Sequence, residues 1–343
     1  MKAFQVLWTP PLYNRSLGGL PLQGTVGSRD DYFPDYYLTT MIMSVLQWKR
    51  NHQDPITLYG DSTVINYFST YKLLELWDGF DYETLNAVDK RINPSCFYSA
   101  GKFFAYLKES APCVIVDLDL ILWNPLDFGD RNKVLFTHWE SVLPPTRWYC
   151  PPDELQASKH FKFDSAWDLS INASNTSIVF FPDEHIKNLY AETAISFMID
   201  NPAPGDYNVT PELLYVEQRL LPMMVCSERG AEGISPILQT TWTPAEEKFT
   251  QHDPRIGEWK YFSLDKSMPF THLWIAKKQI ERDEAYRRYM CRKLLLDILA
   301  INPLLRSTLC DIPCLQEHIS VISKKAYALN DDLDCSPMLN GNE

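Results

Sequence analysis

The chain has 343 residues, a length that allows one large domain or two modest ones. Its 32 lysines and arginines against 44 aspartates and glutamates give a formal net charge of −12, which is unsuited to general nucleic-acid binding through basic surfaces. The 45% hydrophobic and 22% charged content is typical of globular proteins and excludes a disordered chain.

The amino terminus and the cysteines indicate the compartment. The first residues read as a strand rather than a signal peptide, and no run of about 18 apolar residues predicts a membrane span. The eight cysteines are scattered; Cys310 and Cys314 have a helical spacing, but no neighbouring pair completes a zinc set. We therefore expect a cytoplasmic protein with reduced thiols, in which the glycosylation sequons at Asn172, Asn175 and Asn208 are accidental.

The first 120 residues alternate strand-like and helix-like segments, the pattern of an α/β protein with a largely parallel sheet. A loop with glycine and proline, 10–34, separates the first strand from the first helix and is long enough to suggest a function. The expected strands are 3–9, 55–59, 82–86 and 113–118, and the expected helices are 37–51, 64–77 and 95–109.

After residue 120 the pattern is weaker. Residues 139–170 are rich in tryptophan, proline and charge and show no clear period. Further strands are expected at 134–138 and 176–181, an extended segment at 270–274, and helices at 213–224 and 286–299. The tail beyond about residue 330 is expected to be frayed.

The most specific local signal is an apolar strand that ends in Asp117-Leu-Asp119. At the carboxyl edge of a parallel sheet, where such folds bind ligands, the two carboxylates share one side of the strand. They can therefore bind one hard cation, Mg²⁺ or Mn²⁺, which would bridge a diphosphate. The alternatives are two solvated acids, or a phosphohydrolase of the haloacid dehalogenase type. That class usually opens the chain with its motif and follows it with glycine, whereas three strand–helix units come first here and Leu120 follows Asp119.

A second signal is the late segment His272-Leu-Trp-Ile-Ala-Lys277-Lys278. Neutral imidazole is a suitable third ligand beside two carboxylates, and a lysine can balance diphosphate charge. The alternative interpretation is a core histidine followed by solvated lysines.

In the order of these motifs the chain resembles glycosyltransferases of the GT-A fold, in particular the glycogenin and lipopolysaccharide galactosyltransferase group. That group has Asp-x-Asp, Asn-x-Gly, Asp-Gln and His-x-x-Gly-x-x-Lys in this order. Here Asn175-Thr-Ser177, Glu217-Gln218 and His272 to Lys278 follow Asp117-Leu-Asp119. The sequence is still more similar to an uncharacterised bacterial branch whose late motif reads His-Leu-Trp. It departs from the group in Ser177 and Ile275, which replace glycines, and in Glu217, which replaces aspartate.

The resemblance implies a GT-A-like nucleotide-diphospho-sugar transferase fold over 1–280, with a mostly parallel central sheet flanked by helices. A helical extension would occupy 281–330, and 331–343 would form a flexible tail. The implied activity is metal-dependent transfer of a hexose from a nucleoside diphosphate donor to an acceptor hydroxyl of a glycan or lipid-linked substrate, as in polysaccharide biosynthesis, with the configuration retained or inverted. A non-catalytic nucleotide- or carbohydrate-binding protein is the further alternative.

The resemblance also implies a role for each candidate residue. The metal ligands, for Mn²⁺ or Mg²⁺, would be Asp117, Asp119 and His272. Nucleotide and diphosphate contacts would come from Tyr13, Lys102, Lys277 and Lys278, although a solvated Lys102 is an equal alternative. Sugar contacts and catalysis would involve Asn175, Glu217 and Gln218, with Glu140 or Glu217 as a base if the enzyme inverts.

An acceptor sugar would stack on Trp139, Trp148, Tyr149 or Trp167. The basic helix 286–299 would contact a membrane surface or simply pack.

Overall fold

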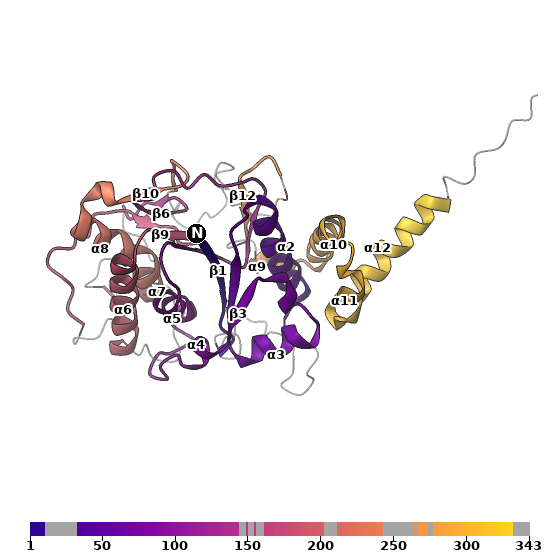
Figure 1. Ribbon diagram of the computed structural model, residues 1–343, viewed down its shortest axis with the longest axis horizontal. Helices are drawn as coiled ribbons and strands as arrows, with labels where there is room; N and C mark the ends of the chain where they lie inside the picture. Colours follow the sequence, from indigo (N-terminus) through magenta and orange to yellow (C-terminus); the bar gives the residue numbers. More distant parts are fainter. Residues whose placement is uncertain are drawn as a thin grey trace, which may run out of the picture.

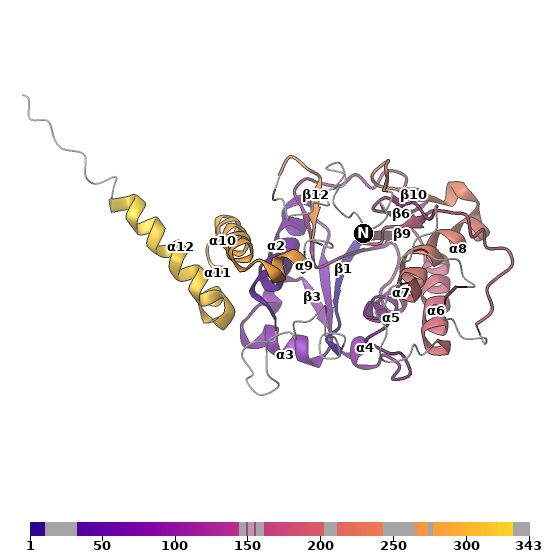
Figure 2. The same cartoon turned by 180° about the vertical axis from the view of Figure 1, so that it is seen from behind.

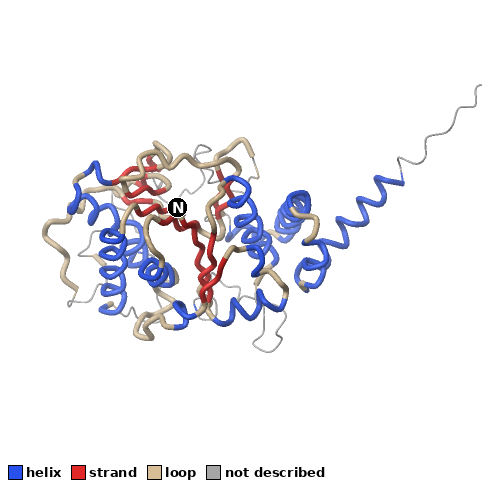
Figure 3. Tube along the Cα trace, viewed as in Figure 1, coloured by secondary structure: helices blue, strands red, loops and turns tan. Residues whose placement is uncertain are grey.

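The computed structural model of the protein describes residues 1–10, 33–143, 149, 154–155, 161–201, 211–242, 264, 266–273 and 277–331, with the backbone alone at 278–279 and 324–331. A mainly parallel sheet runs through the middle of the molecule with helices on both sides (Figure 1; Figure 3). Its strand order is β10-β6-β9-β4-β1-β2-β3. The strands are β1 (Lys2–Leu7), β2 (Ile56–Gly60), β3 (Gly79–Asp81), β4 (Cys113–Val116), β6 (Val134–Phe136), β9 (Ile178–Phe181) and β10 (Ile234–Pro236).

The orientation of one strand makes the sheet mixed. β1, β2, β3 and β4 form parallel pairs, as do β6 and β10, but β9 runs antiparallel to both β4 and β6. The expected α/β class with a largely parallel sheet is therefore confirmed. Two small sheets join its edge: β5 (Leu120–Leu122) with β12 (Phe270–His272), and β7 (Trp139–Glu140) between β8 (Ala173–Ser174) and β11 (Thr241–Trp242).

The two faces of the sheet bury two separate apolar clusters, because neighbouring residues of a strand point to opposite sides. Along β4, Val114 and Val116 belong to one cluster, whereas Cys113 and Ile115 belong to the other. The first face is covered by α2 (Asp35–Asn51), α3 (Ser62–Thr70) and α10 (Glu284–Ile301), and the second by α5 (Ala100–Lys108), α6 (Glu184–Asp200) and α8 (Leu220–Arg229) (Figure 1). The smaller helical elements are η1 (Leu74–Leu76), α4 (Glu83–Asn86), α7 (Pro211–Leu214), η2 (Tyr215–Arg219), η3 (Ala231–Gly233) and α9 (Lys277–Arg282).

Side-chain caps explain where several helices begin. Asp61 precedes α3 and accepts hydrogen bonds from the backbone N–H groups of Thr63 (3.0 Å) and Val64 (3.1 Å). Asp183 caps α6 and Asp283 caps α10 in the same way. The prediction of a strand at 82–86 is wrong, because the side chain of Asp81 accepts a hydrogen bond from the N–H of Thr84 (2.9 Å) and begins α4 there.

The carboxyl-terminal helices share the first cluster with the body of the protein. Leu294, Leu295 and Ile298 of α10 are fully buried in the same cluster as Leu38 and Ile42 of α2. They are followed by α11 (Leu305–Asp311) and α12 (Pro313–Asp331), whose far end extends away from the body in both views (Figure 1; Figure 2). No helix in the described part of the chain is both long and apolar enough to cross a membrane.

Two arginines of α10, Arg288 and Arg292, form ion pairs within the protein. Arg288 pairs with Glu284 of its own helix, and both Arg288 and Arg292 pair with Glu317 of α12. These ion pairs account for part of the basic character that suggested a membrane contact, while Tyr289 and Leu296 of the same helix are exposed.

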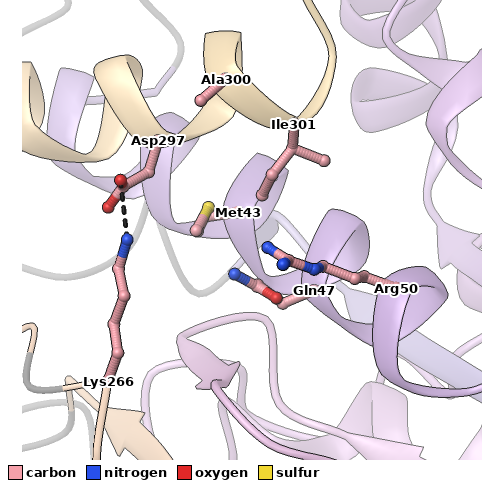
Figure 4. A pocket seen from close by; sticks show the side chains of 7 residues that line it. All are labelled: Met43, Gln47, Arg50, Lys266, Asp297, Ala300 and Ile301. Carbon is pink, nitrogen blue, oxygen red and sulfur yellow. Dashed lines mark hydrogen bonds and ion pairs between the residues drawn. The ribbon is translucent and has the colours of Figure 1, made fainter.

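A cavity of about 440 Å³ lies between α2 and α10 (Figure 4). Within it Lys266 pairs with Asp297 at 2.8 Å, and Arg50 and Gln47 approach from α2. The predicted metal ligands and diphosphate-binding lysines are not among its described lining residues, so it is separate from the carboxylate motif.

Candidate functional site

The Asp-x-Asp motif lies where β4 leaves the sheet. The N–H of Asp117 donates to the carbonyl of Ser177 (2.8 Å), which continues the pairing with β9 one residue beyond β4. A turn follows, in which the N–H of Leu120 donates to the carbonyl of Asp117 (3.1 Å). Both carboxylates are thereby fixed at the edge of the sheet. Asp119 is only 8% exposed, so the alternative of two solvated acids is wrong.

The antiparallel pair of β5 and β12 brings His272 to this edge. His272 lies opposite Leu120, and the N–H of the next residue, Leu273, donates to the carbonyl of Asp119 (3.0 Å). The Nε2 atom of His272 is 3.6 Å from Oδ1 of Asp119. One ligand atom each from Asp117, Asp119 and His272 lies within 4.8 Å of the others. Two carboxylates and an imidazole at these separations fit a divalent cation such as Mn²⁺ or Mg²⁺.

Two lysines neutralise the carboxylates. Nζ of Lys102, on α5, is 2.6 Å from Oδ1 of Asp117 and 2.6 Å from Oε1 of Glu217. Nζ of Lys277, on α9, is 2.6 Å from Oδ2 of Asp119. The interpretation of Lys102 as a solvated helix lysine is therefore wrong. Three carboxylates face two ammonium groups, so the cluster has an excess of negative charge.

The protonation of these groups follows from that balance. Burial disfavours the charged form of Lys102, but Asp117 and Glu217 outweigh it and raise the pKa of this lysine, so it stays charged. Burial likewise opposes ionisation of Asp119, but Lys277 and His272 hold its pKa well below the usual range. Burial, opposed by Lys102 and helped by Asp119 and Glu217, raises the pKa of Asp117. A cation at the cluster would remove that crowding of negative charge.

Glu217 and Gln218 lie on η2, a π-helical turn between α7 and α8. Such a turn widens a helix by one residue and often occurs at functional sites. Its carbonyls are held by side chains: the hydroxyl of Tyr190 donates to Glu217 (2.8 Å) and that of Ser174 to Gln218 (2.9 Å). As a result Glu217 faces Lys102, while Gln218 turns toward the small sheet of β7 and β8.

A buried polar network continues from Gln218. Tyr149 donates through its hydroxyl toward Gln218 and Glu140, and Nδ2 of Asn175 donates to Oε1 of Glu140 (2.7 Å). The hydroxyl of Ser177 in turn donates to Oδ1 of Asn175 (2.6 Å). Glu140, Asn175 and Tyr149 are at most 3% exposed. The structure therefore joins three predicted polar residues, Glu140, Asn175 and Gln218, but holds Tyr149 inside the network rather than on an open stacking surface.

The other predicted residues are distributed differently. Trp139 and Trp167 are half-buried and pack against the second apolar cluster, so only part of each ring is open for an acceptor sugar to stack on. Tyr13, Trp148 and the side chain of Lys278 lie outside the described residues.

Tyr37 is a site residue that the sequence did not single out. It lies in the first turn of α2, and Nζ of Lys277 is 5.9 Å from the centre of its ring. Burial raises the pKa of Tyr37, with the ammonium of Lys277 opposing. An aromatic residue directly after the long loop 10–34 was the available signal, but helical spacing placed Tyr37 only at the start of an ordinary helix.

Comparisons with known proteins give distant likenesses only. No protein-family model matches the chain, and no curated protein sequence matches it. Among solved structures, the chain is similar to the PaToxG glycosyltransferase, at 11% identity and a TM-score of 0.35, over 66% of this chain and 69% of that one. It is also similar to mouse xyloside xylosyltransferase 1 in its apo form, at 10% identity and a TM-score of 0.32, over 68% of this chain and 84% of that one.

Proposed function

We propose that the protein is a metal-dependent glycosyltransferase that moves a sugar from a nucleoside diphosphate donor to an acceptor hydroxyl. The observation that carries the proposal is the cluster of Asp117, Asp119 and His272 at the edge of the sheet, with Lys102 and Lys277 bound to its carboxylates. The order of motifs that resembles GT-A glycosyltransferases supports the same activity.

Asp117, Asp119 and His272 would hold the cation, which supplies Lewis-acid stabilisation of the departing diphosphate. Lys277 is the lysine placed to assist: its side chain is 35% exposed, so its ammonium can turn from Asp119 to a phosphate oxygen. Lys102 is 14% exposed and bridges Asp117 to Glu217, so its role is to hold these two carboxylates in place.

The placement of the acids favours retention of configuration. Glu140 is fully buried and already accepts hydrogen bonds from Tyr149 and Asn175, and Glu217 is held by Lys102. Neither acid is placed to take a proton from an acceptor in solvent. A retaining reaction needs no such base, because an oxygen of the leaving diphosphate can accept the acceptor's proton. Gln218 and Asn175 would then bind sugar hydroxyls after a modest rearrangement of their network.

The test is thermal unfolding with a panel of nucleoside diphosphates, with and without Mn²⁺. A ligand that binds only the folded state raises the melting temperature by mass action. We expect a shift that needs both Mn²⁺ and one particular diphosphate, and that is lost in Asp119→Asn. Asp130→Asn is the matched control, because Asp130 is an acid in the loop before the amino end of β6, at the opposite edge of the sheet.

Sugar release from the matching donor, followed by transfer to simple glycans, would then establish the acceptor. No shift with any diphosphate would refute the donor site. Phosphate release without transfer would instead identify a phosphohydrolase, and a metal-dependent shift without any turnover would identify a nucleotide-binding protein.

A further inference from the structure

A second cluster of metal-ligating side chains lies far from the Asp-x-Asp motif in the sequence, where the carboxyl-terminal helices meet the start of α2. One ligand atom each from Asp35, Cys291 and His318 lies within 4.8 Å of the others. They come from α2, α10 and α12 in turn. Cys291 is fully buried and His318 is 3% exposed, so neither is a surface residue that happens to lie near an acid.

A fourth donor is available on α12. Cys314 precedes His318 by four residues, a spacing that places two side chains on the same face of a helix. The Sγ atom of Cys314 is 3.6 Å from the carbonyl of Phe33, two residues before Asp35, so this face of α12 looks toward the start of α2. Cys314 is not a member of the three-residue cluster, so its side chain would have to turn from the Phe33 carbonyl to complete a set of two cysteines, one histidine and one aspartate.

We propose that Asp35, Cys291, Cys314 and His318 bind a structural zinc ion that fastens α10 and α12 to α2. Cysteine sulfur, histidine nitrogen and aspartate oxygen are the ligands of tetrahedral zinc, and in such a site neighbouring ligand atoms lie about 3.3–3.8 Å apart. Here Oδ2 of Asp35 and Nε2 of His318 are 2.9 Å apart, and the ligand atoms of Asp35, Cys291 and His318 all lie within 4.8 Å of one another. Rotations about the side-chain bonds of these four residues would bring their ligand atoms to the tetrahedral geometry.

The charges also fit a dication. When the metal–sulfur bonds form, each thiol gives its proton to solvent, so two thiolates and one carboxylate offer three negative charges. These balance the zinc ion together with the guanidinium of Arg287, whose Nε is 3.5 Å from Oδ1 of Asp35.

The helices α2 and α9 connect the proposed zinc site to the cluster of Asp117, Asp119 and His272. Asp35 is two residues from Tyr37, which lies beside Lys277, and the hydroxyl of Tyr36 donates to Glu281 of α9 (2.7 Å). A metal ion at Asp35 would therefore brace the turn that carries Tyr37 and the helix that carries Lys277.

The test is cobalt substitution in the full chain, after removal of bound metal by a chelator. A cysteine-ligated Co²⁺ ion gives a thiolate-to-cobalt charge-transfer band, which the cysteine-free cluster of Asp117, Asp119 and His272 cannot give. We expect this band in the wild type with one equivalent of Co²⁺, its loss on adding Zn²⁺, and a Zn²⁺-dependent rise in melting temperature. The band should lose intensity in Cys291→Ser and in Cys314→Ser, because one thiolate remains in each, and disappear when both cysteines are replaced. It should weaken in His318→Asn and persist unchanged in Asp119→Asn.

Two thiol variants serve as matched controls. Cys226→Ser changes a half-buried thiol on α8, and Cys310→Ser changes an exposed thiol at the end of α11. Both should keep the band. The proposal is overturned if the wild type gives no band, if the band keeps its full intensity in both Cys291→Ser and Cys314→Ser, or if it is lost in Cys310→Ser. Because Cys291→Ser affects a fully buried position, Cys314→Ser and the zinc content of the purified wild type decide the matter if that variant does not fold.

Discussion

At the scale of single residues, a lysine and a divalent cation would compete for each carboxylate of the Asp-x-Asp motif. Lys277 occupies Oδ2 of Asp119, where a divalent cation would bind. An ammonium group at 2.6 Å both neutralises the carboxylate and repels a metal ion. The same ammonium, once displaced, would be the nearest positive charge for a diphosphate. Lys277 should therefore weaken the binding of metal alone and strengthen the binding of metal with nucleotide.

Lys277→Met separates these two effects. Removing the charge while keeping the aliphatic stem should make Mn²⁺ bind more tightly to the free protein, because the cluster then carries one more net negative charge. It should also weaken binding of the matching nucleoside diphosphate by about tenfold to a hundredfold, the loss of one or two charge-assisted hydrogen bonds. Titration calorimetry with Mn²⁺ alone and then with the nucleotide measures both. Lys90→Met, at an exposed position, is the control; a fall in both affinities in Lys277→Met would contradict this account.

How much of this cluster the sequence predicts differs from residue to residue. Asp117 and Asp119 follow from local pattern, since an apolar strand that ends in Asp-x-Asp places both acids at a sheet edge. His272 was predicted as the third ligand from the order of motifs, although the pairing of β5 with β12 that brings it to Asp119 shows no periodicity in the sequence. The bridge from Lys102 to Glu217 could not be predicted, because it depends on the π-helical turn that carries Glu217.

At the scale of elements, what decides whether an element is predictable is a clear apolar pattern, which α2, α10, β2 and β4 have and α6 and the shortest strands lack. The expected helices 37–51 and 286–299 correspond to α2 and α10 within two residues at each end, since apolar spacing and terminal charges mark them. The sequence gives no orientation for β9, whose four residues are apolar throughout and buried on both faces. The helix α6 was not predicted, because Leu189, Ile195 and Ile199 lie outside its buried face and obscure the helical period of its apolar residues.

Close packing of α5 on β1 is a second element-scale feature. A Cβ atom added to Gly101 would lie 3.0 Å from Cβ of Trp8 and 3.2 Å from Cγ1 of Val6. Gly101→Val should therefore lower the free energy of unfolding by about 1–3 kcal/mol, the usual cost of overpacking. It should also reduce activity, because Lys102 is the next residue. Urea denaturation measures the first effect. In Gly79→Val, the matched control, the added Cβ meets Oγ1 of Thr57 at an ordinary 3.6 Å, so an equal loss there would refute the packing argument.

The end of α2 is joined to β2 and β3 by one titratable side chain. Asp78 accepts hydrogen bonds from Nζ of Lys49 (2.7 Å) and from the N–H of Ile56 (3.0 Å). Partial burial opposes ionisation, but these two donors outweigh it and lower the pKa of Asp78. A carboxyl with a lower pKa in the folded state contributes stability above its unfolded pKa, about 3.9, and loses it as the pH falls through the folded pKa.

Asp78→Asn should accordingly be less stable than the wild type at pH 7, by about 0.5–1.5 kcal/mol after allowance for solvent screening. The difference should narrow as the pH falls below about 4, because the unfolded wild-type chain then binds a proton at this carboxyl more readily than the folded one. Urea midpoints at pH 7 and pH 3 measure the change. Glu75→Gln, an exposed acid in the neighbouring turn, is the control. A difference that stays constant with pH would show that the shape of the side chain, and not its charge, is responsible.

At the scale of the whole molecule, the sequence suggests a catalytic domain that ends near residue 280 and a separate helical extension. The buried side chains argue for a single folding unit over the described residues. Residues of α10, α11 and α12 contribute to the same apolar cluster as α2 and one face of the sheet. The extension therefore completes the core on that face, and the position of α2, which carries Tyr37, depends on it.

Removing residues 284–343 tests this directly. The deletion exposes the surface of α2 that Leu294, Leu295 and Ile298 cover in the intact protein. Burial of each of these three side chains contributes roughly 1.5–3 kcal/mol, so the deletion removes about 5–9 kcal/mol of hydrophobic stabilisation. That is comparable to the entire free energy of unfolding of a typical domain. We expect the truncated protein to lose cooperative urea unfolding and its near-ultraviolet circular dichroism, and to bind a hydrophobic dye. A chain ending at residue 331 keeps every described side chain and should unfold like the wild type. If the chain that lacks residues 284–343 instead keeps the wild-type urea midpoint and cooperativity, the extension is an independent domain, and α2 keeps its position without it.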